Sequence, residues 1–470
     1  MAENILVDLG PLLSPEASIA LRGDADFAKL TERWREWHAP EVAAVVRVAT
    51  EADVQQTVRF AAQHDIPFVA RAGGHGATEA MGKAKNAIQL DLRSLNQVRV
   101  LENGTTAVIG GGADAKHVVN ELEKVGKRAV TGVCENVGIS AVILGGGHGY
   151  LQGKYGLAAD QVTSARLVLA DGELITVSEN SHPDLFWALK GAGHNFGIVT
   201  EWEYRIYDAP SHKYSYETFI YSGDKVEAFF ELANRMLQGQ PAGVTQWTYL
   251  VKIPQIDADH PVIFFCLIYD GPAGPAREYA APFHAIGPLS AQAGEATYHE
   301  LAVLTFQDAD GLGCAYGATS LRFPTVLKSY NPAALRKVYD DFDATLQQVA
   351  ELAGTIWLIE GHAVQAVQAV NPDSTAFPHR SESVLISPFI NYKPNPALDE
   401  VAQALGRRTR QYLLDGSDDP TKLRAYVNYA HGDEPFGAVY GWETWRLEKL
   451  RELKKEYDPE NRMRYYVPIL

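Results

Sequence analysis

The sequence predicts an α+β protein of two domains, the second built on an antiparallel sheet. The chain has 470 residues, of which 46% are hydrophobic and 21% charged, a balance typical of more than one soluble globular domain. Glycine clusters occur only before about Ala209. Beyond that point, amphipathic helices alternate with strand-like runs, a pattern typical of helices packed on an antiparallel sheet.

Local signals predict the elements of the first part in chain order. Thr50 to Asp53 opens a helix in the manner of a capping box. The apolar run Ile66–Ala70 predicts a short strand, and the alternation across Ile88–Leu92 predicts a half-buried strand. Asn103-Gly104 predicts a hairpin turn, after which Asp114 caps a helix. The other expected elements are a hairpin over 167–177, a helix over 184–190, a strand over 197–207, helices over 225–237 and 332–352, strands over 262–269 and 384–390, and a charged helix from Glu443.

Charge and cysteine content exclude several classes of function. The net charge is −16 and no Lys/Arg cluster is present, which argues against a nucleic-acid or anionic-membrane partner and favours a small-molecule substrate. The three widely spaced cysteines, Cys134, Cys266 and Cys314, indicate neither a disulfide framework nor a zinc site, and we expect no metal. Met1 to Leu21 shows no signal peptide, so we expect a cytoplasmic protein, or a secreted one if a signal has been removed.

Two glycine-rich segments are candidates for ligand binding. In Arg71–Gly76 (RAGGHG), main-chain N–H groups can converge on anionic oxygens such as a pyrophosphate, and His75 would face the same ligand. In Gly145–Tyr150 (GGGHGY), the backbone can approach a flat or phosphorylated ligand closely. Taken singly, the first segment favours a surface turn and the second a tight crossing between packed strands.

A third glycine run needs separate treatment. Gly110 to Ala115 matches G-x-G-x-x-A, the fingerprint of nicotinamide dinucleotide binding. That fingerprint requires the first strand of a parallel βαβ unit, whereas the strand before Gly110 is expected to pair back as a hairpin. Cys134 lies in GVCENVG, where a free cysteine is either a small buried apolar residue or a reactive thiol beside a ligand.

Several long segments together resemble one protein family. They are RAGGHG, GVCENVG, LGGGHGYLQGKYGLAADQV, LVLADGELITVS, NSHPDLFWALKGAGHNFGIVTEWEYRIY, AFPHR, YVNY and YDPEN. In this order they are similar to the vanillyl-alcohol oxidase and p-cresol methylhydroxylase superfamily, and more closely to its berberine-bridge-enzyme-like branch. The resemblance implies a PCMH-type FAD-binding domain at 1–210 (core about 38–209), a substrate-binding domain at 211–424, and a C-terminal segment at 425–470 that returns to the FAD domain.

The resemblance also implies where the cofactor lies. FAD would be held covalently, with His75 on the flavin 8α-methyl carbon and Cys134 on flavin C6, and its pyrophosphate would lie on the main chain of Arg71–Gly76. Beyond His75 and Cys134, the residues implied to contact FAD are Arg71, Ala72, Gly73, Gly74, Gly76, Val137, Gly138, Gly145, Gly146, Gly147, Tyr155, Gly156, Asn195, Gly197, Ile198 and Asn428.

The implied reaction is oxidation of an alcohol on a carbohydrate or secondary metabolite, with O2 as acceptor and hydrogen peroxide as product. Tyr429 matches a position used as the base, and Tyr426 would support it; a phenol needs its pKa lowered to act at neutral pH. A small residue at Val137 resembles the oxygen-reactive members.

Other readings of the active site stay open. Plant members carry Glu or Gln shortly after PHR, where this chain reads VLISPF at 384–389, and Glu382, His431 and Asp433 are spare candidates. An oxidative cyclase, a dehydrogenase that does not use O2, a nicotinamide-dependent enzyme, and a flavin-bearing protein without turnover therefore remain alternatives. Both tyrosines could also serve only to pack against the flavin.

Overall fold

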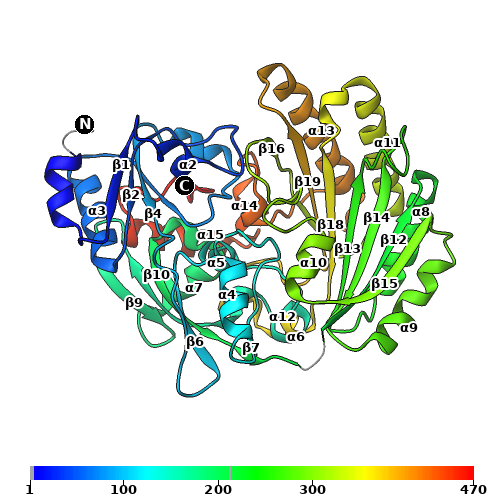
Figure 1. Cartoon of the computed structure of the whole chain (residues 1–470), viewed down its shortest axis with the longest axis horizontal. Coiled ribbons are helices and arrows are strands. Elements are labelled where there is room, and N and C mark those ends of the chain that lie inside the picture. The colour runs from blue at the N-terminus through cyan, green and yellow to red at the C-terminus, as the bar shows by residue number, and fades with distance from the viewer. Residues whose placement is uncertain (1–4, 211–212) are drawn as a thin grey trace.

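The computed structural model describes residues 5–210 and 213–470. Strands up to and including Asp208 form a four-stranded, a five-stranded and a two-stranded sheet, and strands from Tyr214 to Tyr392 form an eight-stranded sheet. In Figure 1 the two groups of sheets lie side by side along the long axis, and the C-terminal segment lies with the first group.

The four-stranded sheet belongs to residues 5–210, which we call the first part. Its order is β1 (Ser18–Leu21), β2 (Val42–Arg47), β4 (Ala87–Asp91) and β3 (Phe68–Arg71), with β2 and β3 both parallel to β4. Every residue of β4 is buried because β4 is an inner strand, so the expectation of a half-buried strand is wrong. Helix α3 (Glu51–Gln63) begins with the predicted capping box of Thr50 and Asp53.

The five-stranded sheet is antiparallel throughout. Its order is β5 (Val98–Val100), β6 (Thr106–Gly110), β10 (Ile198–Arg205), β8 (Val162–Val168) and β9 (Leu174–Ser178), which confirms both predicted hairpins. The predicted cap is also present, since Asp114 Oδ1 accepts the His117 N–H at 2.8 Å at the start of α4 (Ala115–Glu123). The other elements before residue 210 are α2 (Phe27–Thr31), β7 (Lys127–Arg128), α5 (Ile139–Leu144), α6 (Gln152–Tyr155), α7 (Pro183–Ala192) and β11 (Tyr207–Asp208).

This topology rules out the nicotinamide fingerprint at Gly110. Because β6 runs antiparallel to both neighbours, it is not the first strand of a parallel βαβ unit. A Cβ atom on Gly112 would lie 1.7 Å from the Leu92 carbonyl oxygen, and one on Gly111 would lie 2.0 Å from the Val199 carbonyl oxygen. The glycines therefore allow close packing of backbone on backbone.

One face of the eight-stranded sheet is covered by a layer of helices. Residues of α8 (Val226–Leu237), α9 (Ala273–His284), α11 (Pro332–Gln348) and α13 (Pro396–Asp415) form one apolar core with that face. Trp247, Tyr249 and Phe264 on the opposite face cluster instead with Trp34 and Tyr150 of the first part. The strands are β12 (Tyr214–Tyr221), β13 (Val244–Val251), β14 (Val262–Tyr269), β15 (Ser290–Ala296), β16 (Thr319–Leu321), β17 (Thr325–Leu327), β18 (Ile356–His362) and β19 (Val384–Tyr392), with α10 (Tyr298–Leu304) and α12 (Gln365–Ala369) in the connections.

The C-terminal segment packs against the first part. Helices α14 (Phe436–Tyr440) and α15 (Thr444–Tyr457) join the apolar core that contains α7. Lys454 Nζ donates to the Asn195 carbonyl oxygen at 2.8 Å, which fastens α15 to the loop before β10. The domain boundaries at 210 and 424 stay predictions. Within 5–210 and 213–470, the helices are all too short or too polar to cross a membrane.

Candidate active site

One cavity lies between the first part and the face of the eight-stranded sheet that carries Phe389. The loop at Ala72–Gly76 and the loop at Cys134–Gly138 border it from one side, and Arg322, Phe389 and Tyr429 border it from the other. Both predicted features, a glycine-rich cradle and a tyrosine on the C-terminal segment, therefore meet at the same space.

The two loops cross so closely that only glycine is accommodated. A Cβ atom on Gly73 would lie 2.3 Å from the Asn136 carbonyl oxygen, and one on Gly138 would lie 2.4 Å from the Ala72 Cβ atom. Gly74 has φ +85°, in the left-handed region that favours glycine. The glycines therefore let the two loops pack backbone against backbone while both line the cavity.

His75 presents a neutral imidazole in the cavity wall. Its ring stacks on Trp34 with centroids 5.8 Å apart, and its buried Nε2 atom has no hydrogen-bond partner among the described residues. Burial lowers the pKa of His75 to about 3, assisted by the charges of Arg322 and Arg71 and opposed by a hydrogen bond with Asn136. A neutral imidazole keeps a nitrogen lone pair, which is the form required of a nucleophile.

A buried hydrogen-bonded chain lies on the opposite wall. The Tyr429 hydroxyl donates to Glu360 Oε1 at 2.9 Å, and Glu360 Oε2 lies 2.9 Å from His362 Nε2. Glu360 and His362, both in β18, are almost fully buried. The geometry provides a route by which a proton can leave the cavity through Tyr429.

The expectation that neighbours lower the pKa of Tyr429 is wrong. Burial and the charge of Glu360 raise the pKa of Tyr429 well above its ordinary value, and Arg322 opposes them only in part. Tyr429 is therefore a neutral phenol with a carboxylate acceptor behind it. Such a phenol can take a proton while it passes its own to Glu360, so no free phenolate is needed.

Tyr426 supports Tyr429 by packing. Its ring lies edge-on to Tyr429, with centroids 5.0 Å apart, and edge-on to His148 at 4.7 Å. The Tyr426 hydroxyl accepts a hydrogen bond from Asn428 Nδ2 at 2.8 Å, and burial raises the pKa of Tyr426 to about 12. Its hydroxyl is thus bonded to Asn428, and Tyr429 is the tyrosine with a proton acceptor.

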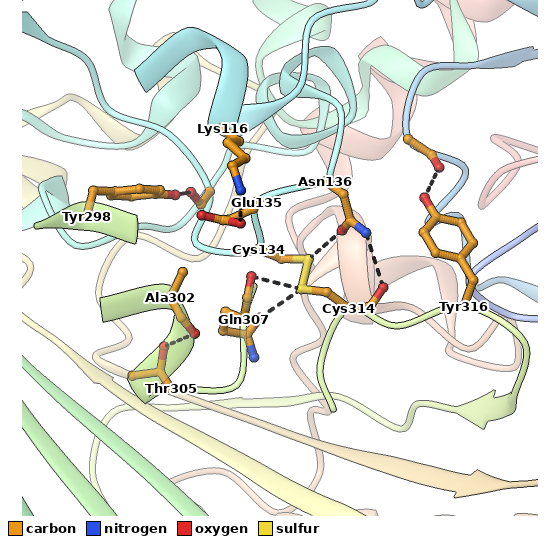
Figure 2. Close-up of a disulfide and its surroundings, with 12 residues drawn as sticks. Lys116, Cys134, Glu135, Asn136, Tyr298, Ala302, Thr305, Gln307, Cys314 and Tyr316 are labelled. Atoms are coloured by element: carbon orange, nitrogen blue, oxygen red, sulfur yellow. Dashed lines mark hydrogen bonds and ion pairs between the residues drawn. A yellow bond between two sulfur atoms is a disulfide. The ribbon is translucent and has the colours of Figure 1, made fainter. Parts of the chain in front are cut away.

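A disulfide joins the two sides of the cavity wall. Cys134 bonds to Cys314, which lies 180 residues away in the connection between α10 and β16, with Cα atoms 6.1 Å apart. Figure 2 shows Asn136 beside the bond, where Asn136 Nδ2 donates to the Cys314 carbonyl oxygen at 3.3 Å. On the same connection, the Tyr316 hydroxyl donates to the Gly73 carbonyl oxygen.

This bond corrects the expectation that the cysteines form no disulfide. The cysteine count was a poor guide because one cysteine, the buried Cys266, stays free while the other two pair across the fold. It also bears on the predicted flavin link of Cys134. One sulfur cannot hold both bonds, so a thioether to flavin requires this disulfide to open.

Comparison with known proteins identifies the family. Residues 42–178 match the model of an FAD binding domain, and residues 425–469 match the model described as berberine and berberine like. An FAD-linked oxidoreductase of Penicillium rubens, chyH, is 38% identical over 467 residues, which cover 98% of this chain and 93% of that protein. This chain belongs to the berberine-bridge-like family of FAD-linked oxidoreductases. FAD is accordingly its cofactor, and the protein is an oxidoreductase.

Solved structures show the same fold over nearly the whole chain. 6-Hydroxy-D-nicotine oxidase from Arthrobacter nicotinovorans superposes with a TM-score of 0.79 at 25% identity, covering 97% of this chain and 98% of that one. A glucooligosaccharide oxidase from Acremonium strictum, which carries 6-S-cysteinyl, 8α-N1-histidyl FAD, superposes with a TM-score of 0.81 at 20% identity, covering 98% and 99%.

The structure brings most of the predicted site residues of this FAD-linked oxidoreductase to the cavity. Those that line it are Arg71, Ala72, Gly73, Gly74, His75, Gly76, Cys134, Val137, Gly138, Gly197, Ile198, Tyr426, Asn428 and Tyr429. The spare candidates Glu382, His431 and Asp433 lie away from it. Glu382 pairs with Arg424 at 3.3 Å, and Asp433 pairs with Arg410 at 2.8 Å.

Six residues predicted to contact the dinucleotide lie outside the cavity lining: Gly145, Gly146, Gly147, Tyr155, Gly156 and Asn195. The glycine run packs against protein, since a Cβ atom on Gly145 would lie 2.0 Å from Asn428 Oδ1 and one on Gly146 would lie 2.5 Å from Phe377 Cδ2. Tyr155 stacks on Tyr207 at 3.7 Å.

The other two of these residues are also used in packing. A Cβ atom on Gly156 would lie 2.9 Å from Asp160 Oδ2, and Asn195 Nδ2 donates to the Tyr440 hydroxyl at 3.0 Å. In the structure all six therefore hold the fold together around the site, and the family pattern alone did not separate them from the residues that border the cavity.

Several residues that line the cavity or lie behind Tyr429 were not identified from the sequence. Glu360 and His362 left a signal, because IWLIEGH places a carboxylate and an imidazole inside an otherwise apolar strand. Arg322 follows the short strand Thr319–Leu321, which contains Thr and Ser, so it left no comparable signal. Nothing in the local sequence of Trp34 indicated its contact with His75.

Proposed function

We propose that this enzyme is an oxidase that removes hydride from an alcohol group of a carbohydrate or secondary metabolite and passes the electrons to O2, producing hydrogen peroxide. The observation that supports it is the Tyr429–Glu360 hydrogen bond in the same cavity as the glycine loops and His75. FAD, when bound, supplies the hydride acceptor and the site that reacts with O2.

The chain offers a cradle that fits FAD. Main-chain N–H groups at Arg71–Gly76 and Gly138 would hold the pyrophosphate, since both loops line the cavity. The unpartnered Nε2 atom of His75 marks an imidazole with no protein ligand, which suits a covalent link to the cofactor. Trp34, stacked on His75, fixes the orientation of that imidazole.

Proton removal is the task of Tyr429 together with Glu360 and His362 of β18. The substrate hydroxyl would donate to the Tyr429 oxygen while the Tyr429 proton moves to Glu360, 2.9 Å away. His362, 2.9 Å from the other carboxylate oxygen, keeps Glu360 oriented. Phe389, Trp34 and Tyr426 give the same space an apolar lining.

Val137 supports the assignment of O2 as acceptor. It lines the cavity beside Gly138 and is small enough to leave access there. A dehydrogenase that does not use O2 would need that access blocked. Measuring anaerobic reduction and aerobic peroxide release on the same preparation separates these two possibilities, because only an oxidase shows both.

We propose His75 as the first covalent link and Cys134 as a second one that forms when the Cys134–Cys314 disulfide is open. Protein digested with and without prior reduction would be examined by mass spectrometry for flavin on the peptides that contain His75 and Cys134. Absence of flavin on the His75 peptide would refute the covalent proposal. Flavin on His75 alone under reducing conditions would refute the Cys134 link.

The function itself is tested by a substrate screen. Yellow protein would be mixed with oligosaccharides and aromatic or aliphatic alcohols, and peroxide would be measured beside Tyr429→Phe. The proposal expects peroxide from at least one alcohol and its loss in the variant. Wild-type protein that holds FAD yet is reduced by no alcohol would refute it, and conversion of an alcohol-free substrate to a cyclic product would indicate an oxidative cyclase.

A further inference from the structure

Arg322 is a buried cation with an unused donor in the active-site cavity. Its side chain is 7% exposed and lines the cavity just after β16. Its Nε donates to Ser387 Oγ at 3.2 Å, whereas its buried Nη2 has no hydrogen-bond partner among the described residues. Since buried guanidinium groups are normally paired, this donor indicates a missing acceptor.

The protein holds this guanidinium in place without neutralising it. Its central carbon lies 3.4 Å from the Tyr429 ring centroid and 3.9 Å from that of Phe389, so cation–π contacts fix its position. Glu360 attracts it, but the two Glu360 oxygens are engaged by Tyr429 and His362. Burial lowers the pKa of Arg322, yet arginine stays protonated at neutral pH.

The other arginines of the cavity wall donate through terminal nitrogens to protein acceptors, although the buried Nε atom of each has no hydrogen-bond partner among the described residues. Arg71 donates through Nη1 and Nη2 to the carbonyl oxygens of Leu30 and Glu32, at 2.7 and 2.9 Å. Arg33 Nη2 donates to Gln89 Oε1 at 2.7 Å. Both belong to the side of the cavity with the glycine loops, whereas Arg322 lies beside Tyr429.

We propose that Arg322 binds a carboxylate of the substrate, so that the enzyme oxidises hydroxy acids. This inference rests on the proposed oxidase function and names its substrate class. A carboxylate supplies the acceptor that Nη2 lacks and also offsets the charge of Arg322 once Glu360 has received the proton. A neutral sugar offers only hydroxyl acceptors and cannot supply that charge.

The short distance between cation and base restricts the substrate further. The guanidinium stacks on the same ring that carries the Tyr429 hydroxyl, so the carboxylate and the reacting carbinol must be only a few bonds apart. A 2-hydroxy acid with an apolar substituent meets this condition, because Phe389 and Trp34 provide an apolar wall. The net charge of −16 would repel an anion, which makes a local cation necessary for binding.

The test compares two isosteric ligands that cannot be oxidised, phenylacetate and phenylacetamide, on the FAD-loaded protein. Dissociation constants come from the change in visible flavin absorbance. We expect phenylacetate to bind about 10- to 100-fold more tightly than the amide, the range for a hydrogen bond to a charged group. Arg322→Met should abolish this preference, and Arg322→Lys should keep part of it.

Arg277→Met is the matched control, because Arg277 is an exposed arginine on α9. It should leave the preference unchanged. Equal affinities of the wild type for the two ligands would overturn the proposal even if Arg322→Met fails to fold, and so would a preference that survives in Arg322→Met. Oxidation of a neutral alcohol such as benzyl alcohol is measured separately. A protein that oxidises this alcohol but does not bind phenylacetate would refute the carboxylate site and leave the proposed oxidase function intact.

Discussion

Glu360→Gln tests the proton route most directly. The substitution keeps the size of the side chain and an oxygen that can accept the Tyr429 hydrogen bond, now 2.9 Å long, but the amide cannot take a proton. If Glu360 is the final proton acceptor, the variant has no group that can receive the proton, while substrate and cofactor binding remain. The change should therefore lower the rate of flavin reduction and leave the dissociation constant of the substrate nearly unchanged.

The expected magnitude follows from the role of the residue. A positioned general base contributes about 10²- to 10⁴-fold to rate, or about 3 to 5 kcal/mol. Tyr429→Phe removes the group that contacts the substrate and should lose a similar factor. Since both residues act in one chain, the double variant should lose little more than either single variant.

Stopped-flow reduction of the flavin under anaerobic conditions measures this rate without interference from O2. Glu382→Gln is the matched control, because Glu382 is also a buried carboxylate but pairs with Arg424 outside the cavity. Reduction at the wild-type rate in Glu360→Gln would refute the proton route. Fully additive losses in the double variant would show that the two residues act independently.

Three further predictions follow. Cys314→Ser should lower the free energy of unfolding by up to about 5 kcal/mol, because the disulfide closes a loop of 180 residues; denaturant titration checks this, and an unchanged midpoint would contradict it. Burial raises the pKa of Asp270, but hydrogen bonds from Arg128 and Lys154 outweigh this effect and hold the pKa below its ordinary value. The ionised Asp270 therefore stabilises the folded protein above about pH 4, and this stabilisation is lost as pH falls through the lowered pKa. Asp270→Asn should lower the free energy of unfolding by about 3 to 5 kcal/mol at neutral pH and reduce the further loss of stability in acid. Melting temperatures measured across pH check this, and a decline below about pH 4 as steep as that of the wild type would exclude it. Val137→Leu should slow reoxidation by O2 and spare anaerobic reduction, and equal effects on both rates would argue against the role of Val137 in oxygen access.

Local signals were sufficient for much of the fold. The capping box at Thr50 and the cap at Asp114 depend on contacts within one helical turn, so both could be predicted from neighbouring residues. The hairpin turn at Asn103-Gly104 is equally local. The burial of β4 was missed because it depends on strands β2 and β3 on either side, which no local pattern reveals.

The sequence by itself determined the family, the cofactor, the RAGGHG loop with His75, and the presence of Tyr429, since these depend on residue types in a fixed order. Only the tertiary structure decided which glycines border the cavity, that Cys134 meets Cys314, and that Glu360 and Arg322 flank Tyr429. These groups lie on strands and connections far apart in the chain. Their charges and donors acquire a function only when folding buries them against one another, and that burial depends on the packing of the whole sheet against the first part.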